Sequence, residues 1–330
     1  MKINRLLYRS LTIITLCFSK QAEIRESWAA LLDTNFEQIH ATHHINNLIR
    51  QNAIPSSKKE QDLLDRIGIK VLDEKLLVMM PEQMDEIYQT THFNIHYDTD
   101  GSSGSVSSND VNNNSVPDYV ENMGLIFEDV YHFFKDSMGY DITFLNSQNV
   151  GNNKYDIFID NLPTNYFAIT YTTSFINQAS TSCGSYIKMR NNYNGSAFQN
   201  ITELENIKIT AAHEFFHAIQ FSYNCYERFW LMEATAVWSE DKIYNEINDH
   251  YRYMPSWFQN SAKPIDDESS HMYGSFIFFQ YIDEHLGGYE TIKNIWERSR
   301  SNANSVNDVS FKSINEALGS VGSSFSGALN

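Results

Sequence analysis

The sequence predicts an α+β protein in which a small mixed sheet precedes a mostly helical part. Strand-like runs with alternating apolar residues occur at 92–97 and within 154–193, where Asn, Pro and Gly separate them. From residue 210 onward, apolar residues recur mainly at helical spacing. A group of strands followed by a group of helices is typical of α+β folds.

Length and composition are those of a globular protein with a substantial core. The chain has 330 residues, of which 42% are hydrophobic and 14% aromatic, enough for one large domain or two ordinary ones. Its formal net charge is −17, with only 24 Lys and Arg residues. This balance argues against a nucleic-acid partner, because such proteins gather basic side chains on one face.

Residues 1–22 have the layout of a secretory signal peptide. Three basic residues, Lys2, Arg5 and Arg9, precede an apolar run over 11–18. The run is too short for a stable membrane anchor, and no other segment approaches the roughly 20 apolar residues of a membrane helix. We therefore expect a secreted, extracellular protein without a stable membrane span; the alternative is an ordinary amphipathic first helix.

Residues 23–90 are expected to be helical, because apolar residues recur at helical spacing, with breaks at Pro55 and Pro81. The region is either a helical layer of the fold or a pro-segment that shields a cleft. His43 and His44 are adjacent, so they point to different faces of a helix, and we interpret them as surface residues. The main domain is expected over 91–330.

Residues 110–121 match a calcium-binding loop of the EF-hand kind. Oxygen ligands stand at positions 1, 3, 5, 7, 9 and 12 of such a loop, here Asp110, Asn112, Asn114, Val116 through its carbonyl, Asp118 and Glu121. Ser115 replaces the glycine of the sharp turn, at a conformational cost. A strand and loop precede the segment, so we expect one structural Ca²⁺ site without a paired EF-hand; the alternative is a solvated Asn-rich loop.

Export would place Cys183 and Cys225 in an oxidising compartment. There they either form a disulfide between a strand and the end of a helix or remain two buried thiols.

Residues 213–217 read HEFFH on an amphipathic helix. His213 and His217 are four residues apart, so both imidazoles reach one Zn²⁺ from the same helix face. Glu214 points to the side of the metal, where it can act as general base toward metal-activated water. Composition alone predicts on the order of 0.03 such matches in a chain of this length.

A zinc site needs a third protein ligand. Gln220 and Tyr223 stand where a metzincin has Gly and His, which excludes that pattern. Glu233, in the helical segment FWLMEATAVWSED, is a costly charge on an apolar helix face unless it is paired or binds a metal. We expect Glu233 to complete a zinc site over 213–233; a salt-bridged carboxylate is the alternative.

HEFFHAIQF followed by WLMEATA resembles the gluzincin arrangement, and WLMEATA is similar to the zinc aminopeptidase motif WLNEGFA. FNIHYDTDG, DVNNNSVPDYVE, YDIFID and MYGSFIFFQYIDEHLG, in the same order, resemble a family of secreted bacterial metalloproteases over about 92–298. The resemblance implies a gluzincin-like fold with zinc ligands His213, His217 and Glu233 and with Glu214 as catalytic base. It also implies that Tyr273 stabilises the oxyanion; packing among phenylalanines is the alternative.

These observations predict a secreted zinc metallopeptidase with domain 91–330, a helical part over 234–330, and peptide or protein substrates. Glu240 is expected to contact a zinc histidine, and the strand near 185–190 to pair with extended substrate. No motif for gripping a free N-terminus is visible, which favours an endopeptidase. The alternatives are a non-catalytic, calcium-stabilised surface or adhesion protein with a protease-like zinc site, and a zinc enzyme acting on non-peptide substrates.

Overall fold

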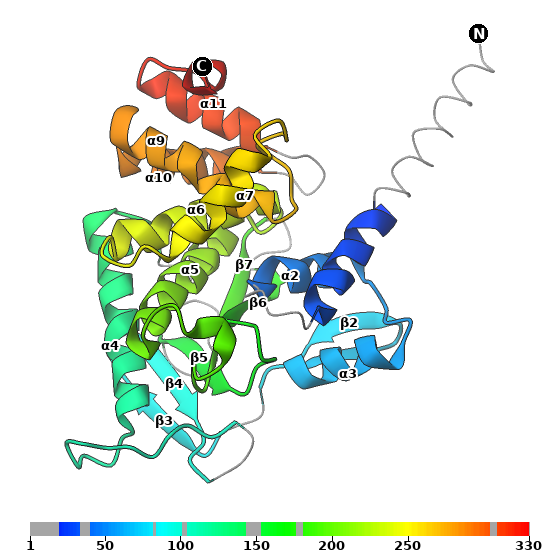
Figure 1. Ribbon diagram of the computed structural model, residues 1–330, viewed down its shortest axis with the longest axis vertical. Helices are drawn as coiled ribbons and strands as arrows, with labels where there is room; N and C mark the ends of the chain where they lie inside the picture. The colour runs from blue at the N-terminus through cyan, green and yellow to red at the C-terminus, as the bar shows by residue number, and fades with distance from the viewer. Residues whose placement is uncertain are drawn as a thin grey trace.

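The computed structural model describes residues 20–33, 40–81, 84–100, 104–142, 153–175, 181–303 and 309–329. Over these residues the chain is a mixed α+β protein, as the sequence predicts (Figure 1). Residues 1–19 of the expected signal peptide lie outside the described part. Among the described residues, no helix combines the length and apolarity needed to cross a membrane.

The centre of the molecule is a five-stranded mixed sheet in the order β3-β4-β5-β7-β6. The three inner strands run parallel, and the edge strands β3 and β6 pair antiparallel with their neighbours. The strands are β3 (Glu86–Gln89), β4 (Phe93–Tyr97), β5 (Tyr155–Asp160), β6 (Ala168–Phe175) and β7 (Cys183–Arg190). The expected small mixed sheet is therefore confirmed.

One expectation about this sheet is wrong. Strand β7, which contains 185–190, is paired with β5 on one side and with β6 on the other. Its backbone groups are used inside the sheet, so it cannot pair with a substrate. The strands at the two edges of the sheet are β3 and β6.

Helices make up most of the chain after the sheet, as expected. They are α5 (Glu203–Asn224), α6 (Phe229–Ile243), α7 (Met254–Gln259), α8 (His271–Gly274), α9 (Phe276–His285), α10 (Tyr289–Asn302), α11 (Ser310–Ser320) and α12 (Phe325–Leu329). Another long helix, α4 (Asp118–His132), follows the predicted calcium loop and packs on the sheet beside α5 (Figure 1). A capping box between Thr202 and Glu205 fixes the start of α5.

The two faces of the sheet have separate apolar cores. On one face, aromatic side chains such as Phe93 and Tyr155 pack against Phe127 of α4 and Phe215 of α5. On the other face, Tyr171 and Tyr186 pack with the N-terminal helices. Helix α5 is thus enclosed along almost its whole length, with every residue from Ile209 to Asn224 buried.

The N-terminal region is only partly helical, so the expectation for 23–90 needs correction. Residues 20–32, α2 (Ala41–Gln51) and α3 (Lys58–Ile67) are helical, but β1 (Ile69–Leu72) and β2 (Lys75–Val78) form a separate antiparallel pair. Strand β3 lies in this region as well and belongs to the main sheet. Short runs such as IKVL carry too few residues to separate strand from helix by periodicity.

Cys183 and Cys225 form a disulfide, with Cα atoms 5.7 Å apart. Of the two alternatives left by the sequence, the paired one is therefore present. The bridge joins the first residue of β7 to the residue that follows α5, and so fixes the end of the helix that carries HEFFH to the sheet.

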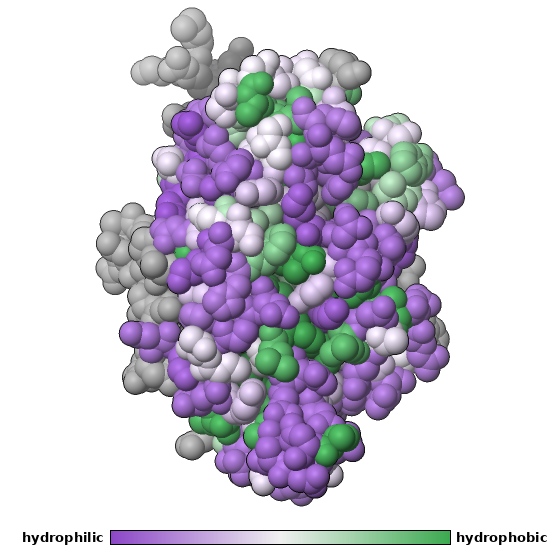
Figure 2. Space-filling model, turned by 90° about the vertical axis from the view of Figure 1, so that its left-hand side faces the viewer, coloured by the Kyte–Doolittle hydropathy of each residue, from purple (hydrophilic) through white to green (hydrophobic). Residues whose placement is uncertain are grey.

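The face of the molecule that carries α4 is mostly hydrophilic. In Figure 2 its apolar side chains occur in small groups between hydrophilic ones. This pattern agrees with the high net negative charge of the chain and is typical of a face in contact with water.

Candidate metal centre

Helices α5 and α6 bring the three expected zinc ligands together in the interior. The Nε2 atoms of His213 and His217 lie 3.0 Å apart, and they are 3.2 Å and 3.3 Å from the two carboxylate oxygens of Glu233. All three side chains are at most 1% exposed. One ion between them would therefore meet two imidazole nitrogens and a carboxylate, which is a common zinc donor set.

Two outer contacts orient the histidines toward this centre. Nδ1 of His213 lies 2.6 Å from a carboxylate oxygen of Glu240, and Nδ1 of His217 lies 2.8 Å from the side-chain oxygen of Gln220. Both partners are acceptors, so they fix the imidazole proton on Nδ1 and leave a lone pair on Nε2. The expected contact of Glu240 with a zinc histidine is present, and Gln220 has the same role for the other histidine.

The resulting donor set fits a cation. Two imidazole nitrogens converge on a carboxylate, and histidine nitrogens lie 3.2 Å and 3.3 Å from the oxygens of Glu233, which is completely buried. Burial alone would lower the pKa of His213, but Glu233 and Glu240 raise it to about 10. Burial alone would raise the pKa of Glu233, but His217 and His43 hold it well below its usual range. Without a metal, a proton on His213 supplies the positive charge that this arrangement requires.

Glu214 lies beside the metal centre and is itself buried. Its Oε2 accepts hydrogen bonds from the hydroxyls of Thr42, at 2.7 Å, and Thr170, at 2.6 Å. Its Oε1 is buried and accepts no hydrogen bond. One oxygen of the expected base is thus held in place while the other remains available as a proton acceptor.

The sequence did not reveal that α2 contributes to this site, and the surface interpretation of His43 is wrong. His43 is 4% exposed, and its Nδ1 lies 3.2 Å from an oxygen of Glu233. His40, just before α2, stacks on His213 with ring centroids 4.0 Å apart. Only a weak signal for this contribution exists: α2 buries polar residues together with Ile45 and Leu48. The local sequence does not indicate which part of the protein these polar residues contact.

Tyr273 lies at the rim of the same site. Its hydroxyl is 3.3 Å from Nδ1 of His43, and its ring stacks on Tyr253 at 5.1 Å between centroids. The hydroxyl of Tyr253 in turn lies 2.8 Å from Nε2 of His40. The structure thus brings Tyr273 next to the residues around the metal centre, and it adds Tyr253 as a second phenol there.

The expected calcium ligands lie in the loop before α4 and in the first turn of that helix. The amide groups of Asn112 and Asn114 contact the two carboxylate oxygens of Glu121 at 2.9 Å and 2.5 Å. The carboxylate of Asp110 accepts from the backbone N–H groups of Asn114 and Ser115. Ser115 has φ of 73°, the left-handed conformation that the missing glycine would normally adopt.

The loop therefore has the left-handed turn of a calcium loop, at Ser115. Asp118 instead accepts a hydrogen bond from the backbone N–H of Val111 and contacts the side chain of Asn109. The side-chain oxygens of Asn112 and Asn114 accept the backbone N–H groups of Asn114 and Val116, so their amide nitrogens face Glu121.

A further histidine and carboxylate group lies on the surface of α4. Nδ1 of His92 is 2.6 Å from Glu128, and His132 is 3.9 Å from the same carboxylate. Glu128 also accepts a hydrogen bond from the backbone N–H of His92. We therefore interpret this group as a structural contact between α4 and the segment just before β4.

The fold and the buried centre together define a mixed α+β protein with a two-histidine, one-glutamate site. A family of unknown function (DUF6055) matches residues 59–313, and the chain belongs to that family. The matched segment contains all three expected ligands and Glu214, but it begins after α2 has ended. None of the curated proteins matches the chain.

Proposed function

We propose that this protein is a secreted zinc-dependent peptidase of gluzincin type that cleaves within peptide chains. The observation that carries the proposal is the buried convergence of His213, His217 and Glu233 beside a carboxylate, Glu214, with one free oxygen. When bound, Zn²⁺ supplies Lewis-acid activation of water and of the scissile carbonyl.

The chain's own residues supply the proton transfer. Glu214 accepts a proton from the attacking water through Oε1 as the water oxygen bonds to the carbonyl carbon. It then returns that proton to the leaving nitrogen as the C–N bond breaks. Thr170 holds the other carboxylate oxygen at 2.6 Å, which keeps Glu214 in one orientation through both steps. Tyr273 donates a hydrogen bond to the oxyanion.

Export and calcium belong to the same proposal. The Cys183–Cys225 disulfide is typical of proteins from an oxidising compartment. A structural Ca²⁺ held by 110–121 suits extracellular conditions, where weak calcium loops are saturated.

Digestion of casein and of a quenched fluorescent peptide library tests the activity. Zinc-loaded protein is assayed before and after limited proteolysis of its N-terminal region, beside Glu214→Gln and the matched surface variant Glu246→Gln. We expect Glu214→Gln to retain zinc but to lose roughly 10²–10⁴-fold in rate, and Glu246→Gln to match wild type.

Two results would overturn the peptidase proposal. One is zinc-loaded wild type that cleaves nothing in either form, which would favour the non-catalytic, calcium-stabilised surface protein. The other is equal activity of wild type and Glu214→Gln.

A further inference from the structure

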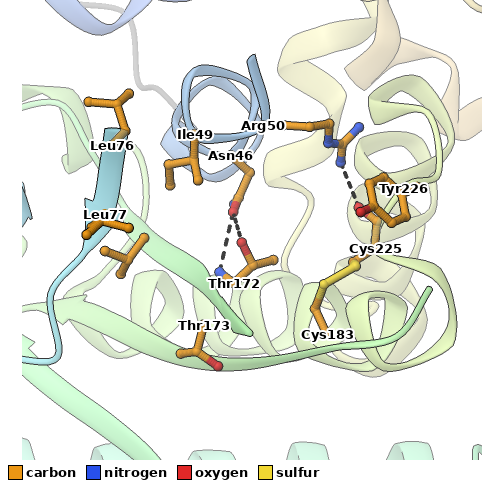
Figure 3. Close-up of a pocket in the computed structure, with 11 residues that line it drawn as sticks. Asn46, Ile49, Arg50, Leu76, Leu77, Thr172, Thr173, Cys183, Cys225 and Tyr226 are labelled. Atoms are coloured by element: carbon orange, nitrogen blue, oxygen red, sulfur yellow. Dashed lines mark hydrogen bonds between the residues drawn. A yellow bond between two sulfur atoms is a disulfide. The ribbon is translucent and has the colours of Figure 1, made fainter. Parts of the chain in front are cut away.

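Helix α2 lies along the free edge of β6 (Figures 1 and 3). An edge strand exposes the N–H and C=O groups of alternate residues, here Thr170 and Thr172. The N–H of Thr170 donates to the hydroxyl of Thr42 at 2.9 Å. The side chain of Asn46 donates to the carbonyl of Thr170 at 3.0 Å and accepts from the N–H of Thr172 at 3.4 Å.

These are the backbone groups that an extended peptide would use if it added a strand to β6. Thr42 and Asn46 of α2 are four residues apart and therefore lie on one helix face. Their side chains make the hydrogen bonds that the backbone of such a peptide would make. Figure 3 shows Asn46 directed from α2 to Thr172. The hydroxyl of Thr172 also donates to Asn46, at 2.8 Å.

The same helix closes the metal centre. Thr42 donates to Glu214 at 2.7 Å, so it occupies one side of the base. His43 stands 3.2 Å from Glu233, and His40 covers the ring of His213. A substrate carbonyl cannot reach the centre while these three side chains are in place.

We propose that α2 is an intramolecular inhibitor that occupies the site of an extended peptide substrate on β6 and must withdraw before catalysis. The inference rests on the proposed peptidase function and adds to it the mode of substrate binding and a latent state. The substrate is then a peptide in extended conformation, paired with β6 at Thr170 and Thr172, and not a folded surface.

The connection between α2 and α3 is open to a protease. Residues 52–57 connect the two helices, and Ile54, Ser56 and Ser57 in this connection are exposed. The family match begins at residue 59, within α3, so it includes the packing of α3 on the sheet and leaves α2 out.

The packing of α2 against its neighbours also leaves two pockets. A pocket of about 390 Å³ is lined by residues of α2, β2, β6 and the disulfide, and another of about 510 Å³ lies between α2, residues 23–27 and Phe229. The strongest tie at the far end of α2 is Arg50, which donates to the carbonyl of Cys225 at 2.7 Å (Figure 3). Withdrawal must break this bond, the contacts to β6 and the packing of Ala41, Ile45 and Leu48 in the core that α2 shares with α3.

The test measures access to the metal separately from activity. A site-specific protease sequence replaces residues 52–57 in the full chain, the zinc is exchanged for Co²⁺, and acetohydroxamate is added while the visible spectrum is recorded. We expect the cut protein to bind acetohydroxamate with a spectral change and the intact protein to give none. Asn46→Leu in the uncut chain should release Co²⁺ to a chelator about tenfold faster than wild type, because the closed state loses the three hydrogen bonds of Asn46 to β6.

Gln51→Ala, at the end of α2 and without contact to β6 among the interactions described, is the matched control and should behave as wild type. Equal acetohydroxamate binding by intact and cut protein would overturn the inhibitor proposal, and so would peptide hydrolysis by intact protein at the rate of the cut form. A third result is possible: the cut protein binds acetohydroxamate but hydrolyses no peptide. That result would support closure of the metal site by α2 and would overturn the peptidase proposal. If Asn46→Leu fails to fold, the cut protein alone decides.

Discussion

At the scale of single residues, the histidine orientation at the metal centre depends on Glu240 and Gln220. Glu240 contacts His213 at 2.6 Å inside the protein, where such an outer partner fixes the ring and strengthens the ligand. We expect Glu240→Gln to lower zinc affinity by about 10–100-fold, measured by competition with a chromogenic chelator. The neighbouring Asp241→Asn should leave the affinity unchanged, and an equal loss in both variants would contradict a specific role for Glu240.

The pKa of His213 predicts a pH dependence of zinc binding. Glu233 and Glu240 raise this pKa to about 10 against the effect of burial, so at pH 7 the metal-free site holds a proton on His213. Zinc must displace that proton. Affinity should therefore rise with pH, about tenfold per unit between pH 7 and 8.5.

Calorimetry in buffers of different ionisation enthalpy counts the protons released. We expect about one proton from His213 per zinc at pH 7. A zinc affinity that is flat across this pH range, with no proton released, would show that His213 is already neutral in the metal-free protein.

At this scale, local signals in the sequence predicted three residues that the structure brings together. HEFFH places two histidines on one face of a helix, and Glu233 stands out as a charge in an apolar helix. Thr42, His43 and Thr170 could not be found in this way, because contacts such as Thr42 with Glu214 join residues 172 positions apart. Only the fold brings them together.

At the scale of elements, the calcium loop and the start of α4 form one unit. Both side-chain oxygens of Glu121, in the first turn of α4, face Asn112 and Asn114 of the loop. We expect the melting temperature of zinc-saturated protein to rise when Ca²⁺ is added, because an ion that binds only the folded state stabilises it.

Glu121→Gln should remove most of this calcium effect, since it removes the ligand that closes the shell. Glu86→Gln, at an exposed position of β3, should retain it. An identical melting temperature with and without Ca²⁺ in the wild type would leave 110–121 as a solvated loop held by its own hydrogen bonds.

The elements also show the limit of periodicity. The long helices α4, α5 and α6 and the strands within 154–193 follow from apolar spacing, and the structure has them. Strands β1 and β2 have four residues each, too few for apolar spacing to distinguish a strand from a helix. The edge position of β6 depends on which strands pair, a non-local property that no single strand encodes.

At the scale of the whole molecule, the Cys183–Cys225 disulfide closes a loop with a sequence separation of 42. Cross-linking a loop of this length restricts the unfolded chain and contributes roughly 4 kcal/mol in the chain-entropy model. The double variant Cys183→Ser/Cys225→Ser should therefore unfold at clearly lower urea concentration than the oxidised wild type. An unchanged urea midpoint would contradict a stabilising role for the bridge.

The most direct test of the metal centre is X-ray diffraction from crystals of zinc-saturated protein, recorded above and below the zinc absorption edge. We expect one strong anomalous peak at about 2.0–2.2 Å from Nε2 of His213, Nε2 of His217 and an oxygen of Glu233. Ordered density for all three side chains with no anomalous peak between them would contradict a zinc site, and with it the proposed chemistry.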